Sequence, residues 1–165
     1  MSDPHPTPDG MAPVSKKVPP LRQPPGSTLD LARLYVVATD TNAAHKAMGT
    51  ELRAVERHGA TVSLPWREDL TEASGGLAAG ALAALLDHVC SLAALVSLDD
   101  EDRFGTTMGL HLDYLEPAVP GLPVHGRAEC IREASGMVFV RGLVFHPECP
   151  ERPLVVAVAT VATAA

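Results

Sequence analysis

Aromatic side chains are scarce in this sequence, which has one Trp, two Tyr and three Phe among 165 residues. Apolar residues nevertheless make up 46% of the chain, enough for a globular protein. A chain of this length forms one domain of ordinary size and can bury a sizeable core. That core must therefore be built from Leu, Val and Ala.

Basic residues are also few, with 13 Lys and Arg against 20 Asp and Glu and a formal net charge of -7. This balance argues against a nucleic-acid-binding surface and against binding to an anionic membrane. It leaves room for a small anionic ligand, which needs only a local Arg or a helix N-terminus.

Cysteine and histidine do not occur in metal-binding patterns. The three cysteines are scattered at positions 90, 130 and 149, and the seven histidines form neither an HxH nor an HExxH motif. We therefore expect no metal site and a reducing, cytoplasmic location. The first residues, MSDPHPTPDG, lack the basic and hydrophobic regions of a signal peptide.

The N-terminal stretch differs in composition from the rest of the chain. Residues 1–26 contain more than half of the fifteen prolines and almost nothing that could be buried. They are predicted to form a disordered arm. Residues 27–165 are predicted to form a single domain.

The pattern after this arm predicts helical segments, two strands, one long helix and then four strands. The helices are expected at 27–38, 41–48 and 75–98, and the strands at 51–56, 60–65, 108–115, 124–130, 137–145 and 154–162. The connections among the last four strands are short, which requires antiparallel pairing. The simplest architecture is an α+β fold in which a curved antiparallel sheet of about six strands wraps one long central helix.

The long helical segment, Gly75 to Leu98, is apolar except for Asp87 and His88. At helical spacing its large side chains share one face, and small residues share the opposite face with Asp87. The large face comprises Leu82, Leu85, Leu86, Val89, Leu92, Ala93 and Val96; the small face comprises Gly76, Gly80, Ala83, Asp87, Ser91 and Ala94. Because a lone carboxylate is costly to bury, we expect the small face to look into a site or a subunit interface.

Two other interpretations of this segment exist. Its length would span a bilayer, but an Asp near the centre opposes insertion by roughly 3 kcal/mol, and no Lys or Arg cluster flanks the segment. The segment could also be an ordinary core helix in which a neighbouring backbone amide satisfies Asp87.

Four stretches in a fixed order carry a family resemblance. They are Glu72 to Gly75, Leu77-Ala78-Ala79-Gly80, Leu85-Leu86-Asp87, and the run from Thr107 to Tyr114-Leu115-Glu116-Pro117. With this spacing, about 47–162 resembles the hotdog-fold acyl-CoA thioesterases of the PaaI-like, phenylacetate-degradation type. The long helix and the antiparallel sheet correspond to that fold.

The resemblance implies hydrolysis of acyl-CoA thioesters, with CoA as part of the substrate and no separate cofactor. Asp87 matches the catalytic carboxylate, which is either a general base or a nucleophile. Thr107 matches a hydroxyl that orients the water. The N–H of Ala79 matches a donor to the thioester carbonyl, and Gly76 and Gly80 belong to the same substrate-binding helix start. The resemblance also implies a dimer or tetramer with sites between subunits.

The sequence departs from the family pattern near the helix start. The family's L-H-G-G motif has Ala78 in place of His and Ala79 in place of its first Gly. Glu72 stands where the family has Asn or Gln, and could act as a second acid or base. An ionised carboxylate there would repel a developing oxyanion. The sequence therefore also allows a non-catalytic acyl-CoA-binding module.

A hotdog dehydratase or hydratase is a further alternative. It would need Asp and His converging on one substrate carbon. Asp87 and His88 are adjacent on a helix, so their side chains point about 100° apart. This spacing disfavours the alternative.

Overall fold

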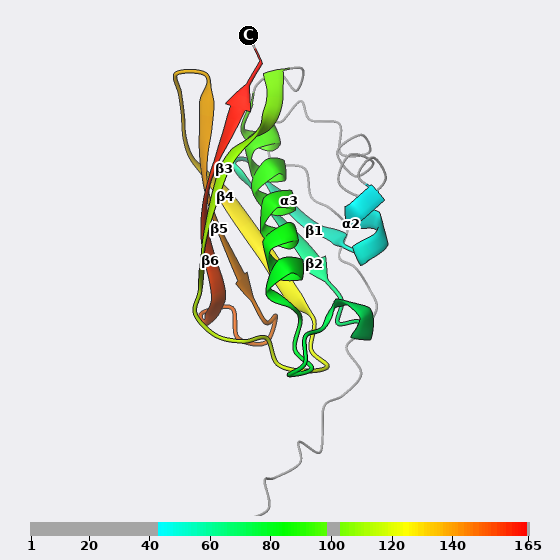
Figure 1. Ribbon diagram of the computed structural model, residues 1–165. Coiled ribbons are helices and arrows are strands. Elements are labelled where there is room, and N and C mark those ends of the chain that lie inside the picture. Colours follow the sequence, from blue (N-terminus) through cyan, green and yellow to red (C-terminus); the bar gives the residue numbers. More distant parts are fainter. Residues whose placement is uncertain (1–42, 99–102, 165) are drawn as a thin grey trace, which may run out of the picture.

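The computed structural model describes residues 43–98 and 103–164, which form one sheet and two α-helices (Figure 1). The elements in chain order are α2 (Ala43–Met48), β1 (Glu51–Glu56), β2 (Gly59–Leu64), the 3-10 helix η1 (Glu68–Leu70), α3 (Ala79–Ser97), β3 (Phe104–Tyr114), β4 (Val124–Ala134), β5 (Met137–Phe145) and β6 (Pro153–Thr163). The proline-rich arm and the helix expected at 27–38 lie outside the described residues.

The six strands form one antiparallel sheet in the order β1-β2-β4-β5-β6-β3. This confirms the predicted fold class. The chain reaches β3 directly after α3, yet β3 pairs with β6 at one edge of the sheet, and β1 forms the other edge. Figure 1 shows α3 running along one face of this sheet, with α2 beside it.

The large face of α3 packs on the sheet as its spacing predicts. All seven of its members are buried. Two strand glycines allow the helix to approach closely: a Cβ at Gly126 would lie 2.9 Å from Leu85 Cγ, and one at Gly142 would lie 2.9 Å from Cys90 Sγ. Although α3 is long and apolar enough to cross a membrane, most of it is buried in the domain, so it is the core helix.

The predicted start of the long helix was wrong by four residues. Helix α3 begins at Ala79, not Gly75. Gly75 has a positive φ of 84°, which glycine tolerates and a helix does not use. Trp66 Nε1 donates to the Gly75 carbonyl at 3.0 Å, and Thr71 bridges to Leu77. These contacts fix a tight loop before the helix, so Gly76 is not part of its small face.

Strand β3 contains an irregularity that its sequence alternation did not indicate. Strict alternation places Met108 on the same side as Leu110 and Leu112, and Thr107 on the other side. The pairing with β6 shifts register between Thr107 and Gly109. Thr107 therefore faces α3, whereas Met108 is 63% exposed. A bulge of this kind redirects a side chain without ending the strand.

Candidate active site

Asp87 lies on the small face of α3, where it meets a hydroxyl from β3. Thr107 Oγ1 donates a hydrogen bond to Asp87 Oδ1 at 2.9 Å. Ser91, one helical turn after Asp87, has its Oγ 3.3 Å from Thr107 Oγ1. A hydroxyl carries one proton, and Thr107 gives its own to Asp87. Ser91 must therefore be the donor to Thr107, which makes an ordered chain of hydroxyls ending at the carboxylate.

This arrangement shows which group hydrogen-bonds to the Asp87 carboxylate. Its partner is a side-chain hydroxyl on β3, not the neighbouring backbone amide that a plain core helix would use. Within residues 43–98 and 103–164, Oδ2 of Asp87 makes no hydrogen bond, and the side chain is only partly buried. One oxygen of the carboxylate is thus held while the other is available to a bound molecule.

The first turn of α3 presents unoccupied backbone donors. Ala78 is the N-cap residue and provides no side-chain cap. The N–H groups of Ala81 and Leu82 both bond to the Ala78 carbonyl, but no acceptor in the described part of the chain is bonded to the N–H of Ala79 or Gly80. Both residues are exposed, and a Cβ at Gly80 would meet nothing within 4 Å. Such a helix start can bind an oxyanion.

The carboxylate and these donors belong to one helix but do not meet in one chain. Ala79 and Asp87 are eight residues apart, which is about 12 Å along an α-helix. A single thioester carbonyl cannot contact both. Tyr114, at the end of β3, donates to the Ala79 carbonyl at 3.0 Å, so the helix start is held by the strand that also carries Thr107.

Glu72 lies in the loop before α3 and is exposed. Its backbone N–H donates to the Gly76 carbonyl at 3.0 Å, and its own carbonyl accepts from Gly75 at 2.8 Å. Ser74 Oγ donates to Glu72 Oε1 at 2.9 Å. The carboxylate is therefore near the helix start, not near Asp87 of the same chain.

Gly76 is buried and occupies a different kind of position. A Cβ built on it would lie 2.2 Å from the Ala118 carbonyl oxygen, which belongs to the connection between β3 and β4. This backbone contact leaves no room for a side chain. The position of Gly76 is explained by the close packing of two loops under the helix start.

Gly76→Ala is expected to reduce the free energy of unfolding by about 2 kcal/mol, because the backbone of the Ala118 connection must move. Urea denaturation of the variant and the wild type checks this. An unchanged denaturation midpoint together with impaired substrate binding would instead show that Gly76 acts at the ligand.

Cys90 lies close to Asp87 in α3 but is not poised as a nucleophile. Burial, and after it the Asp87 charge, raises the pKa of the Cys90 thiol to about 12. The thiol is therefore neutral at physiological pH, and only a thiolate would be reactive. On the other side of Asp87, His88 is buried and stacks on His45 of α2.

The structure thus unites some of the sequence-predicted residues and separates others. Asp87 and Thr107 are in contact, whereas Glu72, Ala79 and Gly80 gather two helical turns away. Sequence reasoning did not assign roles to Ser91, His45 or Tyr114. Ser91 could have been found from its i+4 spacing to Asp87, but no local pattern indicates the contacts of the other two.

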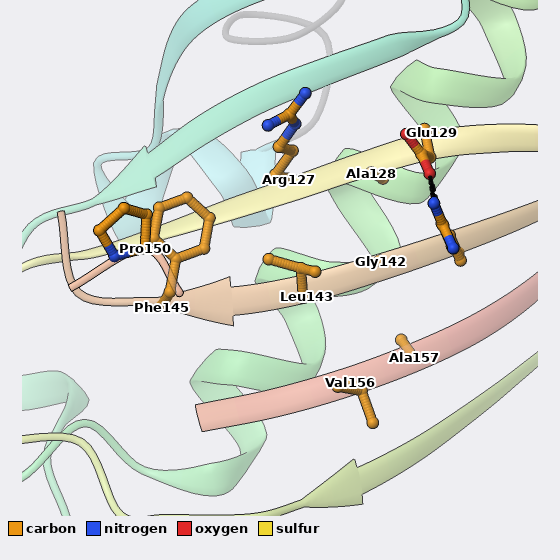
Figure 2. A pocket seen from close by; sticks show the side chains of 10 residues that line it. Arg127, Ala128, Glu129, Gly142, Leu143, Phe145, Pro150, Val156 and Ala157 are labelled. Atoms are coloured by element: carbon orange, nitrogen blue, oxygen red, sulfur yellow. Dashed lines mark hydrogen bonds and ion pairs between the residues drawn. The ribbon is translucent and has the colours of Figure 1, made fainter. Parts of the chain in front are cut away.

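A separate hollow of about 480 Å³ lies on the sheet face away from α3 (Figure 2). Leu143 and Val156 form part of its apolar lining, and Arg127 extends beside it. Arg141 and Glu129, which also line the hollow, form an ion pair with each other. Because the sheet lies between this hollow and α3, it is not the Asp87 site. In the ranges 43–98 and 103–164, no three His, Cys, Asp or Glu residues come together as metal ligands.

Comparisons with known proteins agree with this architecture. The family model of the Thioesterase superfamily matches residues 75–152, which include α3 and Thr107. A search among curated proteins found no match.

Solved structures similar to this chain include a thioesterase family protein from Silicibacter pomeroyi, with a TM-score of 0.72, 21% identity, and coverage of 81% of this chain and 98% of that one. A thioesterase from Haemophilus influenzae has a TM-score of 0.72 at 21% identity and covers 84% of this chain and 92% of its own. The Escherichia coli PaaI protein, from the phenylacetic acid degradation operon, has a TM-score of 0.67 at 12% identity, covering 76% and 87%. These likenesses confirm the fold. Residues 75–152 are thus similar to the thioesterase superfamily, and the fold of the chain is the hotdog fold.

Proposed function

We propose that this protein hydrolyses acyl-CoA thioesters to a free acid and CoA, as a PaaI-like thioesterase. The supporting observation is the Asp87 carboxylate on the small face of α3, with one oxygen held by Thr107 and the other unengaged in the described chain. A carboxylate in this state can serve as a general base or as a nucleophile. Thioesters need no metal for this reaction, since the carbonyl is electrophilic and a thiolate departs readily.

In the general-base route, Asp87 takes a proton from a water molecule, and the water oxygen adds to the carbonyl carbon. The carbonyl electron pair moves onto oxygen, where the N–H of Ala79 stabilises the negative charge. Collapse re-forms the carbonyl and breaks the C–S bond, whose electron pair leaves with the CoA sulfur. The proton on Asp87 passes to that thiolate. In the nucleophilic route, Asp87 adds to the carbonyl carbon, and collapse breaks the C–S bond so that the CoA thiolate leaves. Water then hydrolyses the resulting anhydride, which frees the acid and Asp87, and the proton released passes to the thiolate.

Either route requires two copies of the chain, because Ala79 and Asp87 are about 12 Å apart along one helix. We propose that the helix start of one copy and Asp87 of another form each site, in a dimer or a tetramer. Strand β3 supports this arrangement. It pairs only with β6 in the described sheet, so its other edge offers unpaired backbone groups beside Thr107.

The alternative, a non-catalytic acyl-CoA-binding module, rests on the departures at Glu72, Ala78 and Ala79. A panel of acyl-CoA substrates, with free CoA measured by a thiol reagent, separates the two functions. Crotonyl-CoA hydration in the same panel tests the dehydratase alternative. That alternative is disfavoured because His88 is buried and stacks on His45, so it does not share a target with Asp87.

We also propose a cytoplasmic location, in keeping with three free cysteines.

Glu72→Gln is expected to increase kcat roughly threefold to tenfold, because it removes a negative charge near the developing oxyanion, an effect of about 1 kcal/mol. The matched control is Glu133→Gln, which changes the net charge equally but lies at the far end of β4, beside the turn to β5. If the rate with Glu72→Gln falls at least tenfold, Glu72 is instead an acid or base in the reaction.

A further inference from the structure

A buried histidine directly after β5 uses both of its ring nitrogens on the connection between β3 and β4. His146 is 7% exposed. The N–H of Val119 donates a hydrogen bond to its Nε2 at 3.0 Å, and its Nδ1 lies 2.9 Å from the carbonyl oxygen of Pro123. A backbone N–H only donates and a carbonyl only accepts, so Nδ1 must carry the ring proton and Nε2 must be bare. The two bonds therefore fix His146 as a neutral ring in one tautomer.

The two hydrogen bonds of His146 hold a turn from both of its ends. The N–H of Leu122 donates to the Val119 carbonyl at 3.3 Å, and Gly121 between them has a φ of 79°, as the third residue of a type II turn does. In the part of the chain that the structure describes, no other hydrogen bond joins residues 117–123 to a different segment. His146 therefore supplies the hydrogen bonds that place this turn on the domain.

The same turn packs against the loop that leads into α3. A Cβ on Gly76 would collide with the Ala118 carbonyl, and one on Gly75 would lie 3.5 Å from Pro120 Cβ. Val119 stands between these two contacts in the chain, so the hydrogen bond to its N–H fixes both. Figure 1 shows the two connections meeting at the end of the domain where α3 begins. Because closely packed backbones have no room to slide, a shift of the turn moves the loop.

The loop in turn sets the start of α3. Gly76 lies only three residues before Ala79, and between them the N–H of Ala78 is bonded to the Leu70 carbonyl at 2.9 Å. The contact at Gly76 is therefore passed on to the first residue of the helix with little slack. The N–H of Ala79 is the proposed donor to the thioester carbonyl, and a group misplaced by about 1 Å can cost roughly 10²-fold in rate.

We propose that His146 is a positioning residue for the Ala79 donor. By holding the turn 119–122 against Gly76, it keeps the start of α3 in the orientation that stabilises the oxyanion. This inference rests on the proposed hydrolysis of acyl-CoA. The ring is buried and both of its nitrogens are engaged, so it acts through the turn and not by contact with the substrate.

Two substitutions at His146 separate its hydrogen bonds from its bulk. His146→Leu removes both bonds, and we expect kcat to fall about tenfold with KM within about threefold of wild type, because the donor acts on charge that develops in the transition state. His146→Gln should stay within about threefold of the wild-type kcat, since its amide offers an acceptor and a donor at nearly the spacing of the ring nitrogens. Equal losses of kcat in the two variants overturn the inference, as does a wild-type kcat in His146→Leu.

Val138→Ala is the control for lost stability alone. Val138 is fully buried near the opposite end of β5, away from the turn that His146 holds. Its truncation weakens the core and should leave kcat within about twofold of wild type. A loss of kcat as large as in His146→Leu would show that general destabilisation accounts for the effect, and would overturn the inference.

An Ala79→Pro background tests whether His146 acts through the Ala79 donor. That donor is already absent, so adding His146→Leu should lower kcat by less than about twofold more. A further loss as large as in the wild-type background shows that His146 acts by another route and overturns the inference.

NMR tests the inference independently of hydrolysis. The ¹⁵N signals of the His146 ring in the wild type should show a protonated Nδ1 and a bare Nε2 at neutral pH, a measurement that needs no variant to fold. The amide signals of Gly76 and Ala79 should move in His146→Leu but not in Val138→Ala. A proton on Nε2, or amide signals that do not move, overturns the inference. If the wild type releases no CoA from any acyl-CoA while both signatures hold, the proposed function fails and the hold of His146 on the helix start stands.

Discussion

Asp87→Asn is expected to lower kcat for acyl-CoA hydrolysis by roughly 10³-fold and to leave KM within about threefold of wild type. The amide has the same shape as the carboxylate, and its oxygen can still accept the hydrogen bond from Thr107 that the carboxylate accepts at 2.9 Å. It cannot take a proton from water or attack a carbonyl carbon. CoA release measured over a range of substrate concentrations gives both constants, and circular dichroism with thermal denaturation checks the fold.

Ser91→Ala is the matched control for this variant. Ser91 lies on the same face one turn later and contacts Thr107, but in the described structure no hydrogen bond joins it to Asp87. Its loss should cost less than tenfold in kcat, since the carboxylate and its Thr107 contact remain. A wild-type rate with Asp87→Asn would show that the reaction, if there is one, takes place elsewhere.

The second large effect is expected from Ala79→Pro, which should lower kcat by roughly 10²-fold by removing one donor to the oxyanion. The substitution suits this position. Ala79 is the first residue of α3, where proline is favoured and its missing N–H breaks no helical hydrogen bond. The preceding Ala78 has φ -64° and ψ 147°, the extended conformation that a residue before proline adopts. Ala79→Gly keeps the N–H and should stay within about threefold of wild type.

Mixing the two variants tests whether each site is shared between copies. An Ala79→Pro chain retains Asp87, and an Asp87→Asn chain retains the Ala79 donor. In random dimers half of the molecules are heterodimers, and each has one complete site of its two, so about a quarter of wild-type activity should return. If the mixture is no more active than either variant alone, the donor and the carboxylate are not paired across a subunit interface.

Much of the fold follows from the spacing of apolar residues. The seven large side chains of α3 recur at helical spacing, and all are buried against the sheet. Local turn chemistry also agrees with the ends of elements. Gly49, with φ 73°, follows α2 at the position where glycine commonly ends a helix, and Ser135 and Gly136, both with positive φ, form the turn between β4 and β5. The sequence is enough to predict the ends of elements at these positions, because residues close in sequence determine the backbone conformation there.

The start of α3 and the direction of Thr107 needed tertiary information. An unbroken helical pattern ran back to Gly75, but contacts from Trp66 and Ala118, distant in sequence, hold that segment in a loop. Likewise the bulge in β3 arises in its pairing with β6, and period-two alternation would turn Thr107 away from Asp87. Long-range contacts override local pattern at both places.

In the candidate site, too, some features could be predicted from the sequence and others depend on long-range contacts. Asp87 stood out because it is the one charge on a face of small residues. The family resemblance singled out Thr107 as a hydroxyl that orients the water, but it did not predict the hydrogen bond from Thr107 to Asp87. The stack of His45 on His88 could not be anticipated, because it joins two helices through buried polar rings that follow no apolar periodicity. The Ala79 donor and the Asp87 base lie on one helix, but this does not bring them together, because the eight intervening steps along the helix separate them by about 12 Å.

A single-turnover experiment tests the central claim that Asp87 makes this domain a hydrolase. Purified protein in excess over a panel of acyl-CoA molecules is quenched at intervals, and free CoA and intact thioester are quantified. We expect the wild type to convert bound acyl-CoA completely to acid and CoA, and Asp87→Asn to bind acyl-CoA and leave it intact. Wild-type protein that binds acyl-CoA and retains the thioester would show that the domain is a binding module and not a hydrolase.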